Sequence, residues 1–250
     1  MGNVRAHQTS QRPFSQSVNG GMLLLTESVN SHPVEGAIMN ERFFALPPER
    51  QRDILNAAFK VFANNDYRHA SMQQIADEAC VSKSLLFHYF KNKQELYLHL
   101  WDVAAKQTAR ATQEYGVAET TDFFEMLRRT THAKCAVMRE HPHSFGFAIR
   151  AYYEHDPAVR AAIHRDVDAY ADRGEKLVGR LVDSSALRDD VAIEEVYRQF
   201  VLLTDGYMFQ KNQADAIDAD VIEADFEKII DHWQRVYSKV PSESAKGART

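Results

Sequence analysis

The feature that most constrains the fold is a helical repeat of apolar residues that runs from Pro47 to the last part of the chain. Within 47–66, for example, Ile54, Ala58 and Phe62 fall on one helix face, behind a Pro-Pro-Glu opening that suits a first turn. Alternating apolar and polar residues bounded by turn signals, the pattern of a strand, do not occur. We therefore predict an all-α protein.

Similar stretches predict the remaining helices. Their expected ranges are 71–79, 83–90, 93–114, 120–139, 143–153, 157–183, 190–212 and 218–238. The last two are the most strongly amphipathic. With 10 glycines and 7 prolines in 250 residues, the composition also argues against a loop-rich β-sandwich.

The distribution of charge limits the partners of the chain. The net charge is −5, so a polycationic nucleic-acid coat is excluded. Residues 41–95 hold 8 basic and 7 acidic side chains, and residues 96–250 hold 20 and 26. The first of these segments has the only positive balance, and a local DNA-reading surface there remains compatible with the composition.

No motif indicates a disulfide framework, a metal site or a membrane segment. The cysteines are Cys80 and Cys135 alone, and the apolar cluster at 22–25 is far shorter than the roughly 20 residues that span a bilayer. The histidines at 141 and 143 and the His164/Asp168 pair have spacings that a metal could use, but scattered polar histidines are usually solvated. We expect a cytoplasmic protein without metal or cofactor.

Residues 1–46 differ in composition from the rest of the chain. The first forty carry four charged side chains and no helical or strand period. We expect a disordered tail over 1–46, and a second one over 239–250. An alternative for the first tail is that translation begins at Met39.

Residues 71–90 form the unit that carries the function. Ser71 and Ser82 are placed to cap two short helices, and the break between them is only three residues long. Such helices are stable only when packed on a third one, and the outer face of the second is then free to enter a major groove. Asn92 caps the following helix, where Lys93 lies close to free backbone N–H groups.

The residue order from Ser71 to Leu96, including the run Tyr89-Phe90-Lys91-Asn92-Lys93, resembles the DNA-binding domain of the TetR family of transcriptional regulators. The similarity covers about residues 48–98. It implies a helix-turn-helix domain over 47–92, followed over 93–238 by a linking helix and a larger helical domain that binds an effector and dimerises.

The resemblance also implies roles in DNA binding. Ser71 and Ser82 would touch phosphates, Tyr89 and Lys93 would grip the backbone, and the bases would face Gln73, Lys83, Ser84 and Leu85. Two alternatives stay open: His88 contacts phosphate or only packs, and Leu85 meets a thymine methyl group or only covers the groove wall.

Two positions depart from the family pattern. Cys80 stands where glycine is usual, so we expect a non-glycine residue with a positive φ. Phe87 stands where a phosphate-binding tyrosine is usual, and because it lacks the hydroxyl we expect that contact to be lost or moved to Tyr89.

A palindromic operator, a homodimer and a small-molecule effector are the partners that the resemblance implies. Aromatic residues and methionines of the middle helices are the pocket candidates: Phe123, Met126, Met138, Phe147, Tyr152 and Tyr170. Side chains of the last two helices are the candidates for the dimer interface: Tyr197, Phe200, Thr204, Tyr207, Ile230 and Trp233. Effector binding would shift the separation of two DNA-reading heads.

We therefore predict a ligand-responsive DNA-binding regulator, with repression as the expected mode. A dimeric small-molecule or protein-binding module with a weakened DNA-reading head is the main alternative, suggested by Cys80 and Phe87. An all-α enzyme is the other alternative, but no phosphate-binding glycine loop, nucleophile elbow or zinc-protease motif is present.

Overall fold

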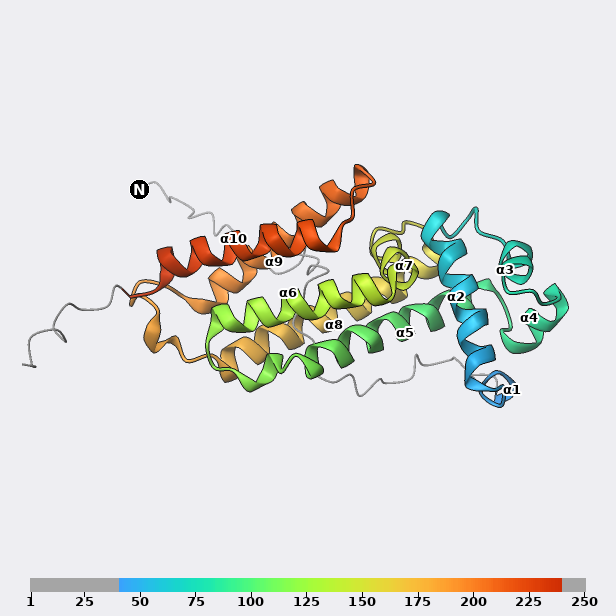
Figure 1. The fold of residues 1–250 in the computed structure, drawn as a ribbon, viewed down its shortest axis with the longest axis horizontal. Helices are drawn as coiled ribbons and strands as arrows, with labels where there is room; N and C mark the ends of the chain where they lie inside the picture. The colour runs from blue at the N-terminus through green and yellow to red at the C-terminus, as the bar shows by residue number, and fades with distance from the viewer. Residues whose placement is uncertain (1–40, 240–250) are drawn as a thin grey trace, which may run out of the picture.

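The computed structural model describes residues 41–239, and these residues form α-helices joined by short loops (Figure 1). The only extended pairing in this range is an isolated antiparallel bridge between Leu187 and Ser238, which confirms the all-α prediction. The helices are α1 (Glu41–Phe44), α2 (Pro48–Asn64), α3 (Met72–Glu78), α4 (Lys83–Tyr89), α5 (Lys93–Glu114), α6 (Phe123–Glu140), α7 (Pro142–Tyr152), α8 (Pro157–Leu181), α9 (Ile193–Gln213) and α10 (Ala219–Tyr237). Two short 3-10 turns lie at Val117–Glu119 and Ser184–Ala186.

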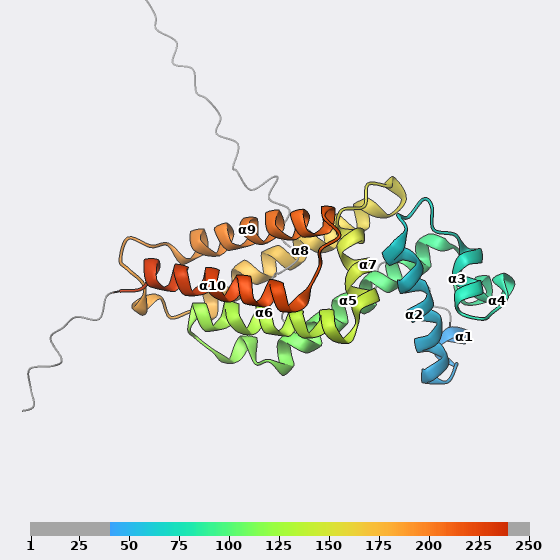
Figure 2. The same ribbon diagram turned by 45° about the horizontal axis from the view of Figure 1, so that its top comes forward.

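Helices α1 to α4 gather at one end of the molecule and form what we call the head (Figures 1 and 2). Its short helices begin where the sequence predicts, because side chains satisfy their first backbone N–H groups. Ser71 accepts from the N–H of Gln74, whose side chain accepts from Ser71 in return, so a full capping box starts α3. Ser82 and Asn92 start α4 and α5 with a single side-chain cap each, which accepts from the N–H of Leu85 and of Glu95.

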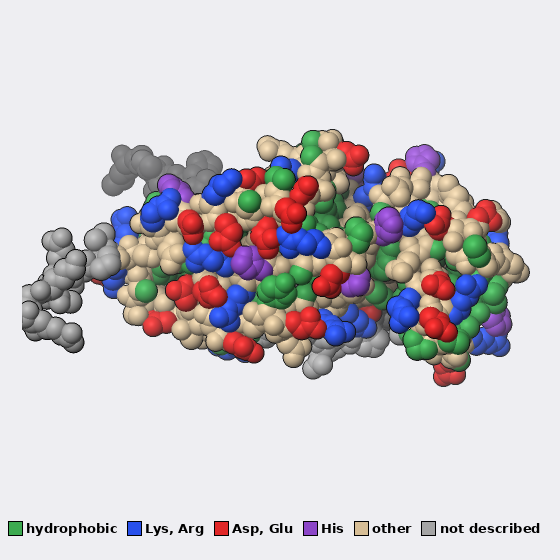
Figure 3. Space-filling model, viewed as in Figure 1, with side chains coloured by type: hydrophobic (Ala, Val, Ile, Leu, Met, Phe, Trp, Pro, Cys, Tyr) green, Lys and Arg blue, Asp and Glu red, His purple; other side chains and the backbone are tan. Residues whose placement is uncertain are grey.

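The remaining helices form an elongated body, in which α5, α6, α8, α9 and α10 run along the long axis (Figures 1 and 2). α6 packs against both α5 and α10, and α8 packs against α9. Arg128 and Arg139 on the outer side of α6 form ion pairs with carboxylates of α10, and His132 lies within hydrogen-bond distance of Glu227 there. Acidic and basic side chains accordingly alternate over the face of the body seen in Figure 3.

Two clusters of buried side chains hold the protein together, and the boundary between them does not follow the boundary of the head. One cluster fills the body between α6, α9 and α10. The other fills the head but extends into α7 and α8, where it includes Phe147, Val159 and Ile163. The ring of Phe147 lies 5.5 Å from that of Phe59 and 4.8 Å from that of Tyr97, measured between centroids. The head core is therefore completed by the body.

The first described residues correct the predicted tail, which we expected to extend to residue 46. Glu41–Phe44 is helical, and Phe43 is buried against Phe90 and Tyr89 with ring centroids 4.9 and 6.0 Å away. Two adjacent aromatic residues supply enough apolar surface to fix this short segment on the head. The predictions for residues 1–40 and 240–250, including the alternative start at Met39, lie outside the described residues.

Phe147 offers a test of the shared core. Phe147→Ala should lower the free energy of unfolding by about 3–5 kcal/mol, because it removes a fully buried ring between α2, α5 and α7. Denaturant unfolding followed by circular dichroism measures this. The control is Tyr115→Ala, at an exposed tyrosine of the body, with an expected cost of about 0.5 kcal/mol or less. Equal costs for the two variants would contradict the shared core.

Candidate nucleic-acid interface

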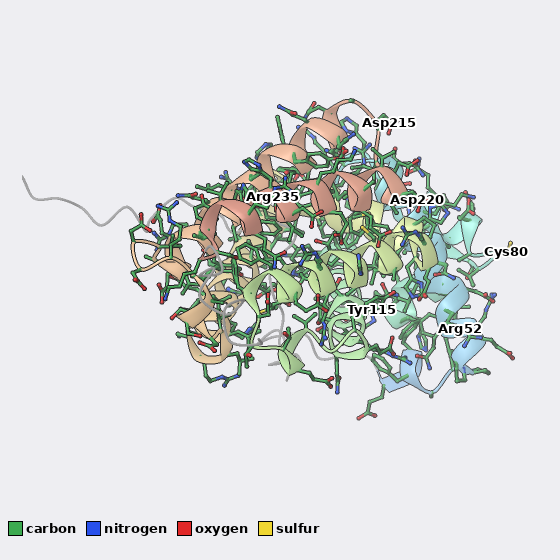
Figure 4. The ribbon with its side chains drawn as sticks, turned by 60° about the vertical axis from the view of Figure 1, so that its left-hand side comes forward. Arg52, Cys80, Tyr115, Asp215, Asp220 and Arg235 are labelled. Atoms are coloured by element: carbon green, nitrogen blue, oxygen red, sulfur yellow. The ribbon has the colours of Figure 1, made fainter. Side chains whose placement is uncertain are left out.

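Helices α3 and α4 and the turn between them form a helix-turn-helix. Ile75, Ala76 and Leu86 are fully buried between the helices, and the N–H of Val81 donates to the carbonyl of Ala76 at 2.9 Å to close the turn. Cys80 has a φ of 52°, which confirms the expected left-handed conformation at a non-glycine residue. It lies at the outer edge of the head with an exposed side chain (Figure 4).

One face of α4 is open to solvent over its whole length. Ser82, Lys83, Ser84 and His88 are exposed on and beside this helix, and Leu85 is 36% exposed. The hydroxyl oxygens of Ser82 and Ser84 lie 3.0 Å apart, while Ser82 also accepts from the N–H of Leu85. These side chains share the surface that the sequence predicts for base and phosphate contacts, and their individual contacts with DNA stay predictions.

Gln73 and Ser71 are exposed at the start of α3. The side-chain amide of Gln73 donates to the carboxylate of Asp77 at 2.7 Å. This carboxylate orients the amide along the helix, so that a base contact by Gln73 requires the hydrogen bond to Asp77 to be shared or broken.

The aromatic residues of α4 are placed differently from the prediction. Tyr89 is only 8% exposed and its ring packs on Phe43 in the head core, whereas Phe87 is 42% exposed. The residue spacing explains this, because position 89 follows the buried Leu86 on the inner side of the helix. The ring of Tyr89 is therefore part of the head core, its contact with the DNA backbone stays a prediction, and the exposed ring is that of Phe87.

Lys93 also has a different role from the expected phosphate contact. Its Nζ atom donates to the carbonyl oxygens of Tyr67 at 2.7 Å and Ala70 at 3.0 Å, and it lies 4.5 Å from the centre of the Tyr67 ring. The ammonium group thus holds the loop between α2 and α3 against the start of α5. We correct the prediction accordingly, because the donors of Lys93 are directed into the protein.

Arg42 of α1 is a cation that the sequence reasoning left out of the interface, since it lay within the expected tail. α1 packs beside α4, and an Arg42 guanidinium nitrogen lies 3.0 Å from Nε2 of His88. Both side chains are exposed. The only sequence signal was the Phe43-Phe44 pair that follows it, which fixes α1 on the head. Arg42 consequently adds a positive charge to the flank of α4.

The pocket candidates are distributed over both cores. Phe123, Met126 and Met138 are buried in the body, and Tyr152 and Tyr170 are half-buried, with the Tyr152 hydroxyl donating to Asp205 at 3.2 Å. Phe147 belongs to the head core, so its assignment to the pocket is corrected. A cavity of about 200 Å³ lies at the end of the body far from the head, and Phe123 is the candidate that lines it.

The candidates for the dimer interface are mostly inward-facing. Four of them are buried in the core of the chain itself and cannot meet a second copy: Tyr197, Phe200, Thr204 and Ile230. Tyr207 and Trp233 are half-buried and pack against the core of the body. Amphipathic spacing identified the apolar face of each helix correctly, but this face packs into the core of the chain itself. The expected interface residues are therefore wrong for these four positions.

The outward faces of α9 and α10 carry other apolar side chains. Leu202 and Phe209 are each 46% exposed, seven residues apart on one face of α9, and Val221 and Val236 are exposed on α10. Between Leu202 and Phe209, Gly206 has no atom within 4 Å of the place where a Cβ would stand. This face of α9 is apolar and sterically open.

A family model for the bacterial regulatory proteins of the TetR family matches residues 54–100, which cover most of α2, all of α3 and α4, and the start of α5. Characterised relatives agree. The transcriptional activator FasR of Mycolicibacterium smegmatis is 30% identical over 142 residues, which are 56% of this chain and 64% of FasR. The transcriptional repressor AcnR of Corynebacterium glutamicum is 25% identical over 168 residues, 65% of this chain and 81% of AcnR.

Residues 54–100 thus match the DNA-binding region of the TetR family, and the chain is similar to regulators of that family beyond this region. Its match spans slightly less than two thirds of FasR, and relatives with both signs of regulation occur at comparable similarity.

Solved structures of TetR family regulators share the fold. One from Chloroflexus aurantiacus matches with a TM-score of 0.63 at 20% identity, over 80% of this chain and 98% of the other. A TetR-like regulator from Rhodococcus sp. RHA1 matches with a TM-score of 0.59 at 23% identity, over 76% and 98%. The arrangement of a helix-turn-helix head on a larger helical body is thus that of the family.

Membrane spans and metal clusters do not occur over residues 41–239. None of the helices in this range is long and apolar enough to cross a bilayer. Within the same range, no three His, Cys, Asp or Glu side chains gather as a possible metal site.

The two lysines of the head provide a test of the corrected roles. Lys93→Met should lower the free energy of unfolding by about 1–3 kcal/mol, because half-buried carbonyls lose their donor. Lys83→Met should leave stability within about 0.5 kcal/mol but weaken binding to a labelled mixed-sequence duplex. Thermal unfolding and fluorescence anisotropy measure the two effects. Normal stability of Lys93→Met together with weakened DNA binding would restore the phosphate role.

The place of Arg42 predicts a contribution to DNA binding. Arg42→Ala should weaken binding to the same duplex and reduce the slope of log K against log salt by about one, as expected when one phosphate contact is removed. Anisotropy titrations at several salt concentrations measure this slope. Arg235→Ala, at an exposed arginine of α10 in the body (Figure 4), is the control and should leave the slope unchanged. A slope equal to that of the wild type for both variants would remove Arg42 from the interface.

Proposed function

We propose that this protein is a homodimeric, sequence-specific DNA-binding regulator whose hold on a palindromic operator is released by a small-molecule effector. The observation that carries the proposal is the solvent-open face of α4, which presents Lys83, Ser84 and Leu85 on a helix of a helix-turn-helix. Side chains at the start of such a helix reach base edges in the major groove.

The two proposed functions, DNA binding and effector binding with dimerisation, are assigned to the two ends of the molecule. The head, which includes α1 as well as residues 47–92, reads DNA, and residues 93–238 bind the effector and dimerise. A head with one short reading helix makes few base contacts, and two-fold pairing doubles them. The outward stripe of Leu202, Gly206 and Phe209 on α9 supports a partner helix at this place, because it offers apolar surface with room for close approach.

Regulation is proposed to act through α5. This helix carries Lys93 at its head end, which is bonded to the loop before α3, and it packs along α6 in the body. A ligand that favours one packing of the body would therefore shift the position of the head and the separation of two reading helices. Repression is the proposed sign, as in AcnR by its name, whereas FasR is named an activator.

Selection of bound sequences from a random duplex pool tests this function. The purified full chain at moderate salt is expected to enrich a two-fold symmetric motif with half-sites about 34–36 Å apart or at a related spacing. Lys83→Ala should relax the base preference within each half-site by about 1–3 kcal/mol for each base that the lysine reads. No enrichment by a folded dimer would refute the DNA-reading function and favour the binding-module alternative.

A variant of the α9 stripe controls for the dimer. Phe209→Asp places a charge in the proposed interface and should give a monomer by light scattering, with loss of the symmetric motif. Tyr115→Asp makes the same change at a tyrosine of similar exposure, 42% against 46%, and should remain dimeric. A dimeric Phe209→Asp protein would place the interface elsewhere.

A further inference from the structure

Lys134 is a lysine in the interior of the body. It lies in the middle of α6 and is 3% exposed, whereas lysines are almost never fully buried in proteins unless something compensates for the lost hydration. Burial lowers the pKa of its ammonium group well below the usual range. The surrounding positions of the helix, Ala133, Cys135 and Val137, belong to the apolar core.

The direction of Lys134 separates it from the ion pairs on the surface. Arg128, His132 and Arg139 share the side of α6 that pairs with α10. At 100° per residue, Lys134 is turned away from that side and lies in a row with Leu127 and Met138, both of which are buried. Its side chain is thus directed into the bundle.

Thr204 of α9 supplies a second buried polar group. Its side chain is completely buried, and its hydroxyl oxygen has no hydrogen-bond partner. Thr112, Thr130 and Thr131, which are equally buried, each donate to a carbonyl of their own helix at 2.8–3.0 Å. Thr204 lacks such a bond, which leaves a hydroxyl donor available inside the core.

The two groups lie at the same level of the bundle. Residues 223–227 of α10 contact both α6 and α9. On α6, the residues on either side of Lys134 that reach this segment are His132, which lies 2.8 Å from Glu227, and Arg139, which pairs with Glu223. On α9, those on either side of Thr204 are Phe200, whose ring contacts Phe226, and Tyr207, which bonds to Asp225. The side chains of Lys134 and Thr204 are both directed toward the centre at that level.

We propose that Lys134 and Thr204 form the anion-binding centre of the effector site, so that the effector is a small organic acid with a carboxylate or phosphate group and an apolar remainder. The Nζ group has two donors as an amine and three as an ammonium, and a bound oxyanion favours the charged form. Lys134 can therefore bind an oxyanion in addition to its contacts within the protein, and the Thr204 hydroxyl donates to the same anion. The apolar core around them suits the rest of such a molecule. The name effector rests on the proposed regulatory function, but binding of the acid does not.

Thermal unfolding of the full chain without DNA tests the site, with sodium decanoate, decyl phosphate and 1-decanol as probes at equal concentration. At about 100 times the dissociation constant, an acidic probe should raise Tm by about 5 °C or more, whereas 1-decanol should give a much smaller shift. Lys134→Met should abolish the response to the acids. Thr204→Val should weaken their binding about tenfold.

The controls separate this site from general effects. Lys176→Met makes the same change at an exposed lysine of α8 and should respond as the wild type does. Lys134→Met keeps the apolar stem of the side chain, so the variant should stay folded, with the circular dichroism spectrum of the wild type when no probe is added. NMR of lysine labelled at Cε adds a second readout, in which the Lys134 signal should titrate below the usual range and move when decanoate is added.

Three results would overturn the proposal: no stabilisation by either acid, an equal shift with 1-decanol, or an undiminished response of Lys134→Met. Each is independent of operator binding. If decanoate binds through Lys134 but the duplex selection enriches nothing, the regulatory function fails and the acid site stands. If an operator is found but Lys134→Met still responds to the acids, the regulator stands and the assignment of this site fails.

Discussion

The aromatic contact between Phe147 of α7 and Phe59, Phe62 and Tyr97 of α2 and α5 is the interaction on which the arrangement of the molecule depends. The ring centroids lie 4.8–6.1 Å apart, and all of these side chains are 0–2% exposed. This contact fixes the direction in which the head projects from the body. The reach of α4 depends on the same contact, since α4 and α2 share this core.

Polar contacts reinforce this junction around its edge. The N–H of Tyr67 donates to the carboxylate of Glu154 at 2.7 Å, and the guanidinium group of Arg150 donates to the carbonyl of Ala63. Lys93 then ties the neighbouring loop to α5. The loop between α2 and α3 is thus held both by the body and by the linking helix. A displacement of α7 or α5 would therefore reach α3 and α4 through short contacts at the edge of the core.

The sequence allowed the helices and the helix-turn-helix to be predicted because the signals are local. Capping serines, apolar periodicity and the turn at Cys80 depend on residues only a few positions apart. The errors concern contacts between distant segments. The acceptors of Lys93 are loop carbonyls some 25 residues away, and the amphipathic pattern of α9 shows which face is apolar but not whether that face meets the core of the same chain or a second copy.

α1 and Lys134 illustrate two further limits. A four-residue helix has too few positions to show a period, so Glu41–Phe44 was assigned to the tail although Phe43 is a core residue. Helical spacing puts Lys134 in the apolar row of Leu127 and Met138, but its residue type favours a solvated position. The three-dimensional arrangement shows that the spacing prevails and the side chain is interior.

The core shared by α2, α5 and α7 also bears on how proteins of this fold can diversify. A head whose core is closed by Phe147, Val159 and Ile163 of the body is not an interchangeable module. A new DNA specificity can arise by changes on the exposed face of α4 alone, but transplanting a whole head between relatives requires that α7 and the first turns of α8 travel with it. Recombination within such a family should therefore leave matched pairs of head and α7, rather than free combinations of heads and bodies.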